Sequence, residues 1–488
     1  MFHPWPNVIV HILAVLLLLG ALLVCPWKEL PRTAWIPPVA FLGSQIVATL
    51  SSSEPSLSLP VLWLDCSLVC AYLLGALVAR DGEKIELVTL AWLAAGILLA
   101  WSGIYQAAVG LKEVEVALHR HPDLVTAMPR ISDWSKAGRI YATFTSPNLL
   151  GGYILSAFFV ILAWCLIPAR QAASAVGGDH HDPAGVAQQQ HTTDRWATWL
   201  GGMLGLLPLL YCFWHSQSKG SYGVLFLTLC VAIILLTRRQ RISIAVIAAL
   251  IALFVAGFIL GYGRLAWTES HRTGAARLEF WRAAWQIGCD HPVAGSGPGT
   301  FAIMYPRYKK PETEPTRFVH NTYLQMWSDS GFAGFATFAV WLPGSLWLQR
   351  WKHLAPKERL IPTLLWCACL GFALHSLVDF DYYSPGNSWP IFLLLGYLAG
   401  CKPGKVEGPP SRFTSVPHGL FQKWRAALCR SLGPDRSFGR LLVPITPMRG
   451  CGTADCRLRP AGARSCGSKH PKWSALQWRT TGWRVPAG

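Results

Sequence analysis

Long apolar segments alternate with short polar stretches through roughly the first 400 residues of the chain. A helix needs about 20 mostly apolar residues to cross the hydrocarbon core of a bilayer. The pattern therefore predicts an all-α polytopic membrane protein with about 11 transmembrane helices, within a range of about 10–12. The predicted spans are 7–26, 33–50, 60–79, 86–109, 148–168, 196–215, 220–237, 242–262, 322–349, 361–380 and 386–401, of which the seventh and the last are short.

The charge of the connecting loops predicts how these spans are oriented. Lys and Arg gather in the odd-numbered loops, counted by the span that precedes each, whereas the short even-numbered loops hold only Lys219. Because cytoplasmic loops carry an excess of Lys and Arg, we expect the odd-numbered loops in the cytoplasm. The N-terminus and the longer segments 110–147 and 263–321 then lie on the outer side.

Composition agrees with a membrane protein and explains the charge. Apolar residues make up 52% of the chain and charged residues 14%, against about 25% charged residues in soluble domains. The formal charge of +18 comes mostly from the segment 402–488, which holds 16 Lys and Arg against 3 Asp and Glu. That segment is rich in Pro, Gly and Arg and is expected to be a disordered cytoplasmic tail. We therefore predict a transmembrane domain over 1–401. The positive charge gives no argument for nucleic-acid binding.

The outer segment 263–321 is predicted to contain a surface helix. Apolar residues recur with a helical period over 276–290, which indicates an amphipathic helix lying at the membrane surface, with Arg277 and Arg282 off its apolar stripe. A glycine-rich turn follows at 295–299; it permits a tight turn, and its backbone could alternatively face an anion. The stripe consists of Leu278, Trp281, Ala284, Trp285 and Ile287.

His320 stands directly before the ninth predicted span. One interpretation makes it a surface residue beside a helix cap formed by Asn321 or Thr322. The other makes it a general base for an acceptor hydroxyl, since a neutral imidazole accepts protons near ambient pH.

Further polar residues mark the ends of other spans. His375 and Asp379 are four residues apart in the tenth predicted span, so they are expected to share a helix face, either as a structural pair or facing a cavity. Arg139 and Lys219 are expected near the same leaflet as the two arginines of 276–290. Guanidinium groups bind phosphate oxygens bidentately, so a lipid diphosphate would suit such a cluster; scattered interfacial anchors are the simpler alternative.

The order of five motifs resembles the O-antigen ligase and Wzy-type polymerase superfamily over roughly residues 85–400. The motifs are G-R-x-Y-x-T-F-x-S-P-N-x-x-G-G, S-x-S-K-G-S-Y-G, R-L-x-F-W-x-A-A-W followed by H-P-V-x-G-S-G-P-G-T-F, V-H-N-T-Y-L-Q-x-W-x-D-S-G, and H-S-L-V-D. The resemblance implies a GT-C-like glycosyltransferase fold in the bacterial inner membrane, with the large periplasmic loop 263–321 between spans 8 and 9.

The same resemblance implies an activity and roles for individual residues. A glycan would pass from undecaprenyl diphosphate, at the periplasmic face, to lipid A-core, to another glycan chain or to a protein, by an inverting reaction without cofactor or metal. An O-antigen ligase is favoured over a polymerase or a protein O-oligosaccharyltransferase. The implied partners are the lipid-linked donor, the acceptor and membrane lipid. The catalytic residue would be His320, the diphosphate would bind Arg139, Arg277, Arg282 and Lys219, and the supporting residues would be Asn321, His375 and Asp379. Lys219 departs from the arginine that the family usually carries there.

A transporter is the competing class of protein. It would show repeated halves with broken helices at the midplane of the membrane. The sequence shows no such internal repeat, and its polar residues gather at one face and in one large outer loop. The pattern therefore favours chemistry at a membrane surface.

Overall fold

The computed structural model describes residues 30–80, 85–121, 129–175, 184–236, 264–348 and 359–400, with isolated helical positions within 12–19 and 246–252. The described continuous ranges belong to one unit, Met1–Lys423. The tail 402–488 and nearly all of the first and eighth predicted spans lie outside the described residues.

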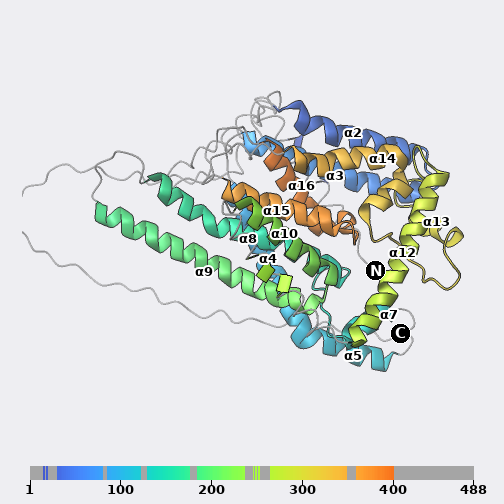
Figure 1. Cartoon of the computed structure of the whole chain (residues 1–488), viewed down its shortest axis with the longest axis horizontal. Helices are drawn as coiled ribbons and strands as arrows, with labels where there is room; N and C mark the ends of the chain where they lie inside the picture. Colours follow the sequence, from blue (N-terminus) through green and yellow to red (C-terminus); the bar gives the residue numbers. More distant parts are fainter. Residues whose placement is uncertain are drawn as a thin grey trace, which may run out of the picture. The chain divides into compact units, whose positions relative to one another are not determined.

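The described residues are helical and contain no strand. Among the described residues, five segments are long and apolar enough to cross a membrane: Arg32–Leu50, Pro55–Ala79, Val88–Arg120, Pro147–Leu166 and Lys219–Leu236. The chain is thus a helical, multi-pass membrane protein, as the apolar pattern predicts (Figure 1). The helices at predicted spans are α2 (Arg32–Leu50), α3 (Pro55–Arg80), α4 (Ile85–Tyr105), α8 (Pro147–Ala175), α9 (Ala184–Ser216), α10 (Lys219–Leu236), α14 (Thr322–Trp347), α15 (Leu360–His375) and α16 (Pro385–Gly400).

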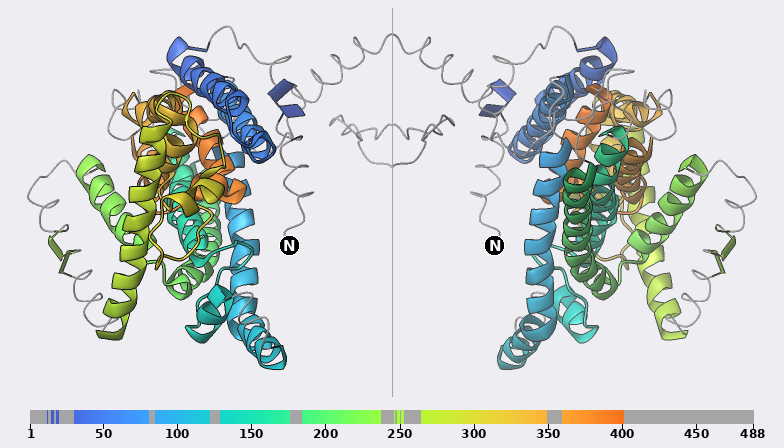
Figure 2. Two further views of the ribbon diagram at one scale, coloured as in Figure 1. Left: turned by 90° about the vertical axis from the view of Figure 1, so that its right-hand side faces the viewer. Right: turned by 90° about the vertical axis from the view of Figure 1, so that its left-hand side faces the viewer.

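Three of these helices show features that the apolar spans do not predict. α4 continues through a π-helical turn, η2 (Gln106–Gly110), into the amphipathic α5 (Leu111–Arg120) (Figure 2). α14 is kinked at Gly331, which adopts φ 61° and ψ −161°. α15 ends at His375, so the prediction of helix to residue 380 is wrong. The chain turns there because the N–H groups of Val378 and Asp379 both bond to the carbonyl of His375.

Small residues let α3 and α16 pack closely. A Cβ on Gly396 would lie 1.8 Å from the carbonyl oxygen of Tyr72, and one on Gly400 would lie 2.3 Å from that of Ala76. Glycines spaced four apart allow such backbone contact between apolar helices, where dispersion and polar contacts replace the hydrophobic effect. This contact fixes the C-terminal half of α16 against α3.

A fully buried aromatic group fills the centre of the bundle. Phe41 of α2 and Phe392 of α16 lie on Trp341 of α14, with ring centroids 5.1 and 4.5 Å apart. Phe338 packs edge-on against Tyr382, which belongs to the short helix η5 (Asp381–Tyr383). The turn between α15 and α16 is therefore anchored in the aromatic core.

The even-numbered loops meet at one end of the bundle, as their shared orientation predicts. Ser53 donates to the carbonyl of Ser296, and Ser296 donates to that of Ser328. Ile140 donates to the carbonyl of His215, and Thr322 to that of Ser376. Segments far apart in the sequence are thus joined by backbone hydrogen bonds beside the starts of α8, α10, α14 and α16.

The predicted surface helix is present and longer than expected. α12 (Arg264–Asp290) packs against α14 (Figure 1). Its buried face carries Phe280, Ala283, Ala284 and Ile287, which pack on α13 (Phe301–Met304), η3 (Tyr305–Arg307) and Val319.

Two residues of the predicted apolar stripe of α12 do not pack inside the protein. Leu278 and Trp285 are 63% and 57% exposed. The reason is that α13 and η3 pack on one side of the helix, and this selects Phe280 and Ala283, which the predicted stripe left out.

Candidate functional site

Asp379 is the centre of a buried polar cluster at the end where the even-numbered loops meet. Its Oδ1 atom lies 3.2 Å from Nδ1 of His320 and accepts the backbone N–H of Phe380 at 2.9 Å. Its Oδ2 atom lies 3.7 Å from Nη2 of Arg277. The carboxyl is almost fully buried, whereas the side chains of His320 and Arg277 are 14% and 24% exposed. The structure thus joins the predicted base and one predicted arginine through a single carboxylate.

The charge state of Asp379 fixes the proton on His320. Burial by itself would raise the pKa of the Asp379 carboxyl, but the hydrogen bond from His320 and the positive charge of Arg277 hold that pKa well below its usual range. An ionised carboxylate only accepts hydrogen bonds, so Nδ1 of His320 carries the proton. Nε2 of the neutral ring then has the lone pair, and within the described residues no side chain or backbone group binds it.

The backbone of His320 is held in a left-handed conformation. Its φ is 55°, which is costly for a residue with a Cβ atom and is found where the surroundings enforce it. On one side, Val319 donates its N–H to Oε1 of Gln325 at 2.8 Å. On the other side, Asn321 caps α14 by accepting the N–H groups of Tyr323 and Leu324. Asn321 is therefore the helix cap that one sequence interpretation expected, and it fixes the chain directly after His320.

His375 belongs to a different buried pair from the one its spacing indicates. Its Nδ1 bonds to Asp381, and its Nε2 lies 2.9 Å from the hydroxyl of Ser221. Asp381 also accepts Nδ2 of Asn387 at 2.7 Å. His375 and Asp379 do not share a helix face, because α15 ends at His375. The pair His375–Asp381 joins the turn after α15 to α10 and α16.

Gly152 of α8 allows the second pair to close against this helix. A Cβ at this position would lie 2.4 Å from Oδ1 of Asp381 and 3.0 Å from Nδ1 of His375. Every larger residue would displace the buried carboxylate, so the second glycine of the S-P-N-L-L-G-G segment is explained by close approach.

Arg139 is held between α8 and α9. Its Nε donates to the carbonyl of Ser216 at 3.1 Å, and its Nη2 donates to Oδ1 of Asn148 at 3.2 Å. The turn that follows is held by Gln106, whose Oε1 accepts the N–H groups of Tyr141 and Ala142 at 2.8 and 2.7 Å. Sequence reasoning missed Gln106, because its role depends on the π-helical turn that turns its side chain toward this segment.

The remaining predicted cations are placed differently. Arg282 forms an ion pair with Glu279, donates to the carbonyl of Tyr308 and donates to Gln286. The structure therefore places it at the loop after η3 and does not bring it to Asp379. Lys219 is exposed as the first residue of α10, next to Gly220, where a Cβ would lie 3.6 Å from Nε2 of His375.

The glycine-rich turn 295–299 is a packing element. Gly297 donates its N–H to the carbonyl of Asp329, and Gly299 donates to the Asp329 carboxylate, both at 2.9 Å. Ser296 donates to the carbonyl of Ser328 at 3.1 Å. These three N–H groups bind α14 and are therefore not directed at an external anion.

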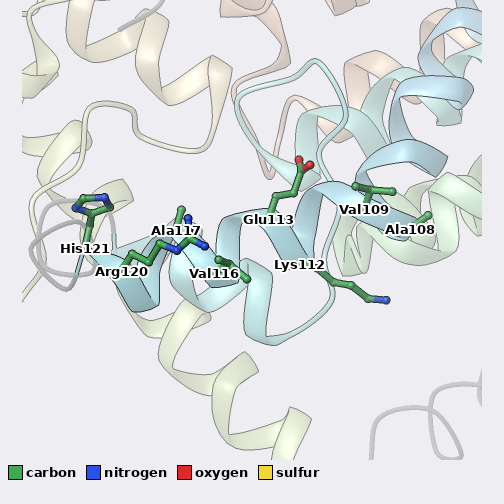
Figure 3. Close-up of a pocket in the computed structure, with 8 residues that line it drawn as sticks. All are labelled: Ala108, Val109, Lys112, Glu113, Val116, Ala117, Arg120 and His121. Carbon is green, nitrogen blue, oxygen red and sulfur yellow. The ribbon is translucent and has the colours of Figure 1, made fainter.

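An open hollow runs along η2 and α5, away from the predicted site residues (Figure 3). Its lining includes Lys112, Glu113 and Arg120 and comes only from residues 108–121 of one continuous helical stretch. A hollow with a single wall does not enclose a ligand, so we place the candidate site at Asp379. Over the described ranges, no three His, Cys, Asp or Glu side chains gather as metal ligands.

A bundle of membrane helices with a histidine–carboxylate pair and arginines at one end defines the chain as a multi-pass membrane protein with a polar site suited to proton transfer. Residues 204–339 match the O-antigen ligase family, which confirms the resemblance indicated by the motifs. No curated protein matches the chain. The matched segment includes Arg277 and His320, whereas Arg139 and Asp379 lie outside it.

Proposed function

We propose that this protein is an inverting glycosyltransferase of the O-antigen ligase type. It transfers a glycan from undecaprenyl diphosphate to lipid A-core at the periplasmic face of the bacterial inner membrane, and it needs no metal. The observation that carries the proposal is the His320–Asp379 pair beside Arg277. His320 and Arg277 belong to the segment that matches the O-antigen ligases, residues 204–339.

His320 serves as the general base in this proposal. Nε2 takes the proton of the acceptor hydroxyl while the hydroxyl oxygen attacks the anomeric carbon of the donor glycan. The bond between that carbon and the diphosphate oxygen breaks, and the diphosphate leaves with the electron pair. Attack from the opposite face inverts the anomeric configuration. Asp379 keeps the ring in the tautomer that can accept the proton and stabilises the imidazolium that forms.

Arg277 and Arg139 bind the diphosphate in this proposal. Negative charge grows on the leaving group as the anomeric bond breaks, so cations that are already in place stabilise the transition state more than the ground state. Arg139 is preorganised by its bonds to Ser216 and Asn148. Arg277 is held beside Asp379 and is partly exposed. We assign Arg282 to holding the loop after η3, and Lys219 remains a predicted neighbour of the diphosphate.

The acceptor separates the ligase from its alternatives. An O-antigen polymerase or a protein O-oligosaccharyltransferase would use the same base and the same cations. The ligase is favoured because the motifs around His320 are closest to that branch.

The test is a gel profile of surface lipopolysaccharide from the source organism after deletion of the gene. The deletion strain is complemented with the wild-type protein, with His320→Ala, and with His291→Ala as a matched control, since His291 is an exposed histidine of the same outer segment. We expect an intact core without long glycan for His320→Ala, and a restored profile for the wild type and the control. A core that carries a single repeat unit after deletion would show a polymerase, and a restored profile with His320→Ala would overturn the role of the base.

A further inference from the structure

Two aromatic rings form a stacked pair beside His320. The rings of Phe318 and Phe380 have centroids 4.4 Å apart and an interplanar angle of 12°. Phe380 also meets the ring of His320 edge-on, with centroids 4.9 Å apart. Phe318 comes from the segment before α14 and Phe380 from the turn after α15. The stacked pair forms because these two segments come together beside His320.

The backbone around each ring is fixed by hydrogen bonds. Oδ1 of Asp379, the atom that binds His320, also accepts the N–H of Phe380. The hydroxyl of Thr316 donates to the carbonyl of Phe318 at 2.9 Å and accepts its N–H at 3.3 Å. The carboxylate that orients the base therefore also positions one ring of the pair.

The pair is half-buried and carries a cation. Neither Phe318 nor Phe380 is fully covered, and Arg317 is exposed. The guanidinium carbon of Arg317 lies 5.6 Å from the centroid of Phe318. A pair that served packing alone would gain more stability from full burial, and it would need no exposed cation over its ring.

We propose that the Phe318–Phe380 pair, with Arg317, is a binding subsite for a sugar ring of the acceptor glycan. One face of a pyranose ring presents C–H groups that pack on an aromatic ring, whose face is electron-rich, while its hydroxyls accept hydrogen bonds from a guanidinium. Ligand sites combine such apolar surfaces with a few directional polar groups. This inference rests on the proposed function.

The position of the pair assigns it to the acceptor. The ring of Phe380 contacts His320, and it is the acceptor hydroxyl whose proton His320 takes. The cations assigned to the donor diphosphate have other partners: Arg277 lies at the second oxygen of Asp379, Oδ2, and Arg139 donates to Ser216 and Asn148. A sugar on the Phe318–Phe380 pair would therefore present its hydroxyl to Nε2.

The test separates the KM for the acceptor from the KM for the donor. The full-length protein in lipid nanodiscs is assayed with lipid A-core and with an undecaprenyl-diphosphate-linked glycan, both purified from the source organism. We expect Phe318→Ala to raise the KM for lipid A-core by about five- to tenfold and to leave the KM for the donor within about twofold. Phe318→Trp keeps an aromatic face and should restore the acceptor KM. Phe332→Ala, which removes a 63% exposed aromatic ring of α14, is the matched control.

A second variant keeps the inference testable if Phe318→Ala unfolds. Phe318→Leu retains apolar volume without an aromatic face, so it should keep the wild-type Tm and still raise the acceptor KM. An unchanged acceptor KM in Phe318→Leu, or an equal rise for donor and acceptor, would overturn the subsite. His320→Ala separates the two proposals: if it is inactive while Phe318→Leu keeps the wild-type acceptor KM, only the subsite fails, and if it is active, the proposed function fails.

Discussion

Asp379 binds His320 across a separation of 59 residues, with Oδ1 3.2 Å from Nδ1. The histidine four residues before Asp379 in the chain, His375, is bonded to Asp381 instead. The segment 375–381 therefore contributes to two separate histidine–aspartate pairs, one with the distant His320 and one within the segment. Only the pair that includes His320 has a partly exposed imidazole, and this is why we place the chemistry there.

Replacing Asp379 with Asn should disable the base while leaving its ring in place. The amide has a donor as well as an acceptor, so it can stabilise the tautomer of His320 that has its proton on Nε2. In that tautomer Nε2 cannot accept the proton of the acceptor hydroxyl. We expect the transfer rate of the purified protein to fall by about 100-fold or more.

Asp133→Asn is the matched control for this substitution, because Asp133 is an exposed carboxylate on α7 (Pro129–Lys136). It should leave the rate unchanged. A wild-type rate with Asp379→Asn would contradict the role of the carboxylate, and thermal unfolding of both variants establishes that they are folded.

Substitutions of His320 should separate stability from activity. With φ at 55°, the position favours Asn, which tolerates the left-handed region, and disfavours a β-branched residue. We expect His320→Val to lose about 1–2 kcal/mol of stability. His320→Asn should lose the transfer activity but unfold near the temperature of the wild type. Equal thermal unfolding of the Val and Asn variants in detergent would show that the left-handed backbone is not retained.

Much of the fold is predictable because bilayer thickness sets the length of apolar segments. α2, α8 and α10 begin within one residue of their predicted spans. The tenth span is predicted too long, since hydropathy does not register that the N–H groups of Val378 and Asp379 both return to His375. The apolar pattern of α12 does not show that Phe280 and Ala283 are buried, because it does not contain the positions of α13 and η3.

The sequence identifies single residues of the site but does not show which residues pair with each other. Motif order identifies Arg139, Arg277 and His320, and the structure brings His320 and Arg277 to one carboxylate. Their partners come from distant segments, and a spacing rule for helices finds only neighbours within one helix. Gln106 gives no signal in the sequence, since an isolated Gln near the end of an apolar helix is ordinary.

Removal of the Gln106 amide should weaken the segment that carries Arg139. Gln106→Leu leaves the N–H groups of Tyr141 and Ala142 without their acceptor, and each unsatisfied buried donor costs about 1–3 kcal/mol. We expect a lower Tm and a lower transfer rate. Gln106→Glu keeps an oxygen acceptor and should recover most of both, so equal losses in the two variants would count against this role of the side chain.

The ion pair between Glu279 and Arg282 should make stability depend on acid pH. The hydrogen bond from Arg282 lowers the pKa of Glu279, although burial opposes this shift. Because the folded pKa is depressed, the pair stabilises the protein fully above the unfolded value of about 4.3, and this stabilisation is lost as the pH falls through the folded pKa.

Glu279→Gln should therefore lower the Tm at pH 7 by the equivalent of about 0.5–1 kcal/mol, since Arg282 is 38% exposed and screened by solvent. The difference from the wild type should shrink as the pH falls below the unfolded value of about 4.3 and through the lowered folded pKa. A difference in Tm that is constant with pH would rule out the ionised pair as its cause. At pH 7 Glu279→Gln should affect the transfer rate of the folded protein less than it affects the Tm. The reason is that Arg282 is placed at the loop after η3 and not at Asp379.

The contact between α3 and α16 should be sensitive to a single methyl group. In Gly396→Ala the new Cβ would lie 1.8 Å from the carbonyl oxygen of Tyr72, and this oxygen belongs to the backbone of a packed helix and is not free to move aside. Overpacking of this kind costs about 1–3 kcal/mol. Gly43→Ala is the control, since a Cβ there meets nothing within 4 Å and an alanine within α2 should be neutral or stabilising by up to about 1 kcal/mol. Thermal unfolding in detergent compares the two variants. A Tm of Gly396→Ala equal to that of Gly43→Ala would mean that α3 and α16 do not approach each other at Gly396.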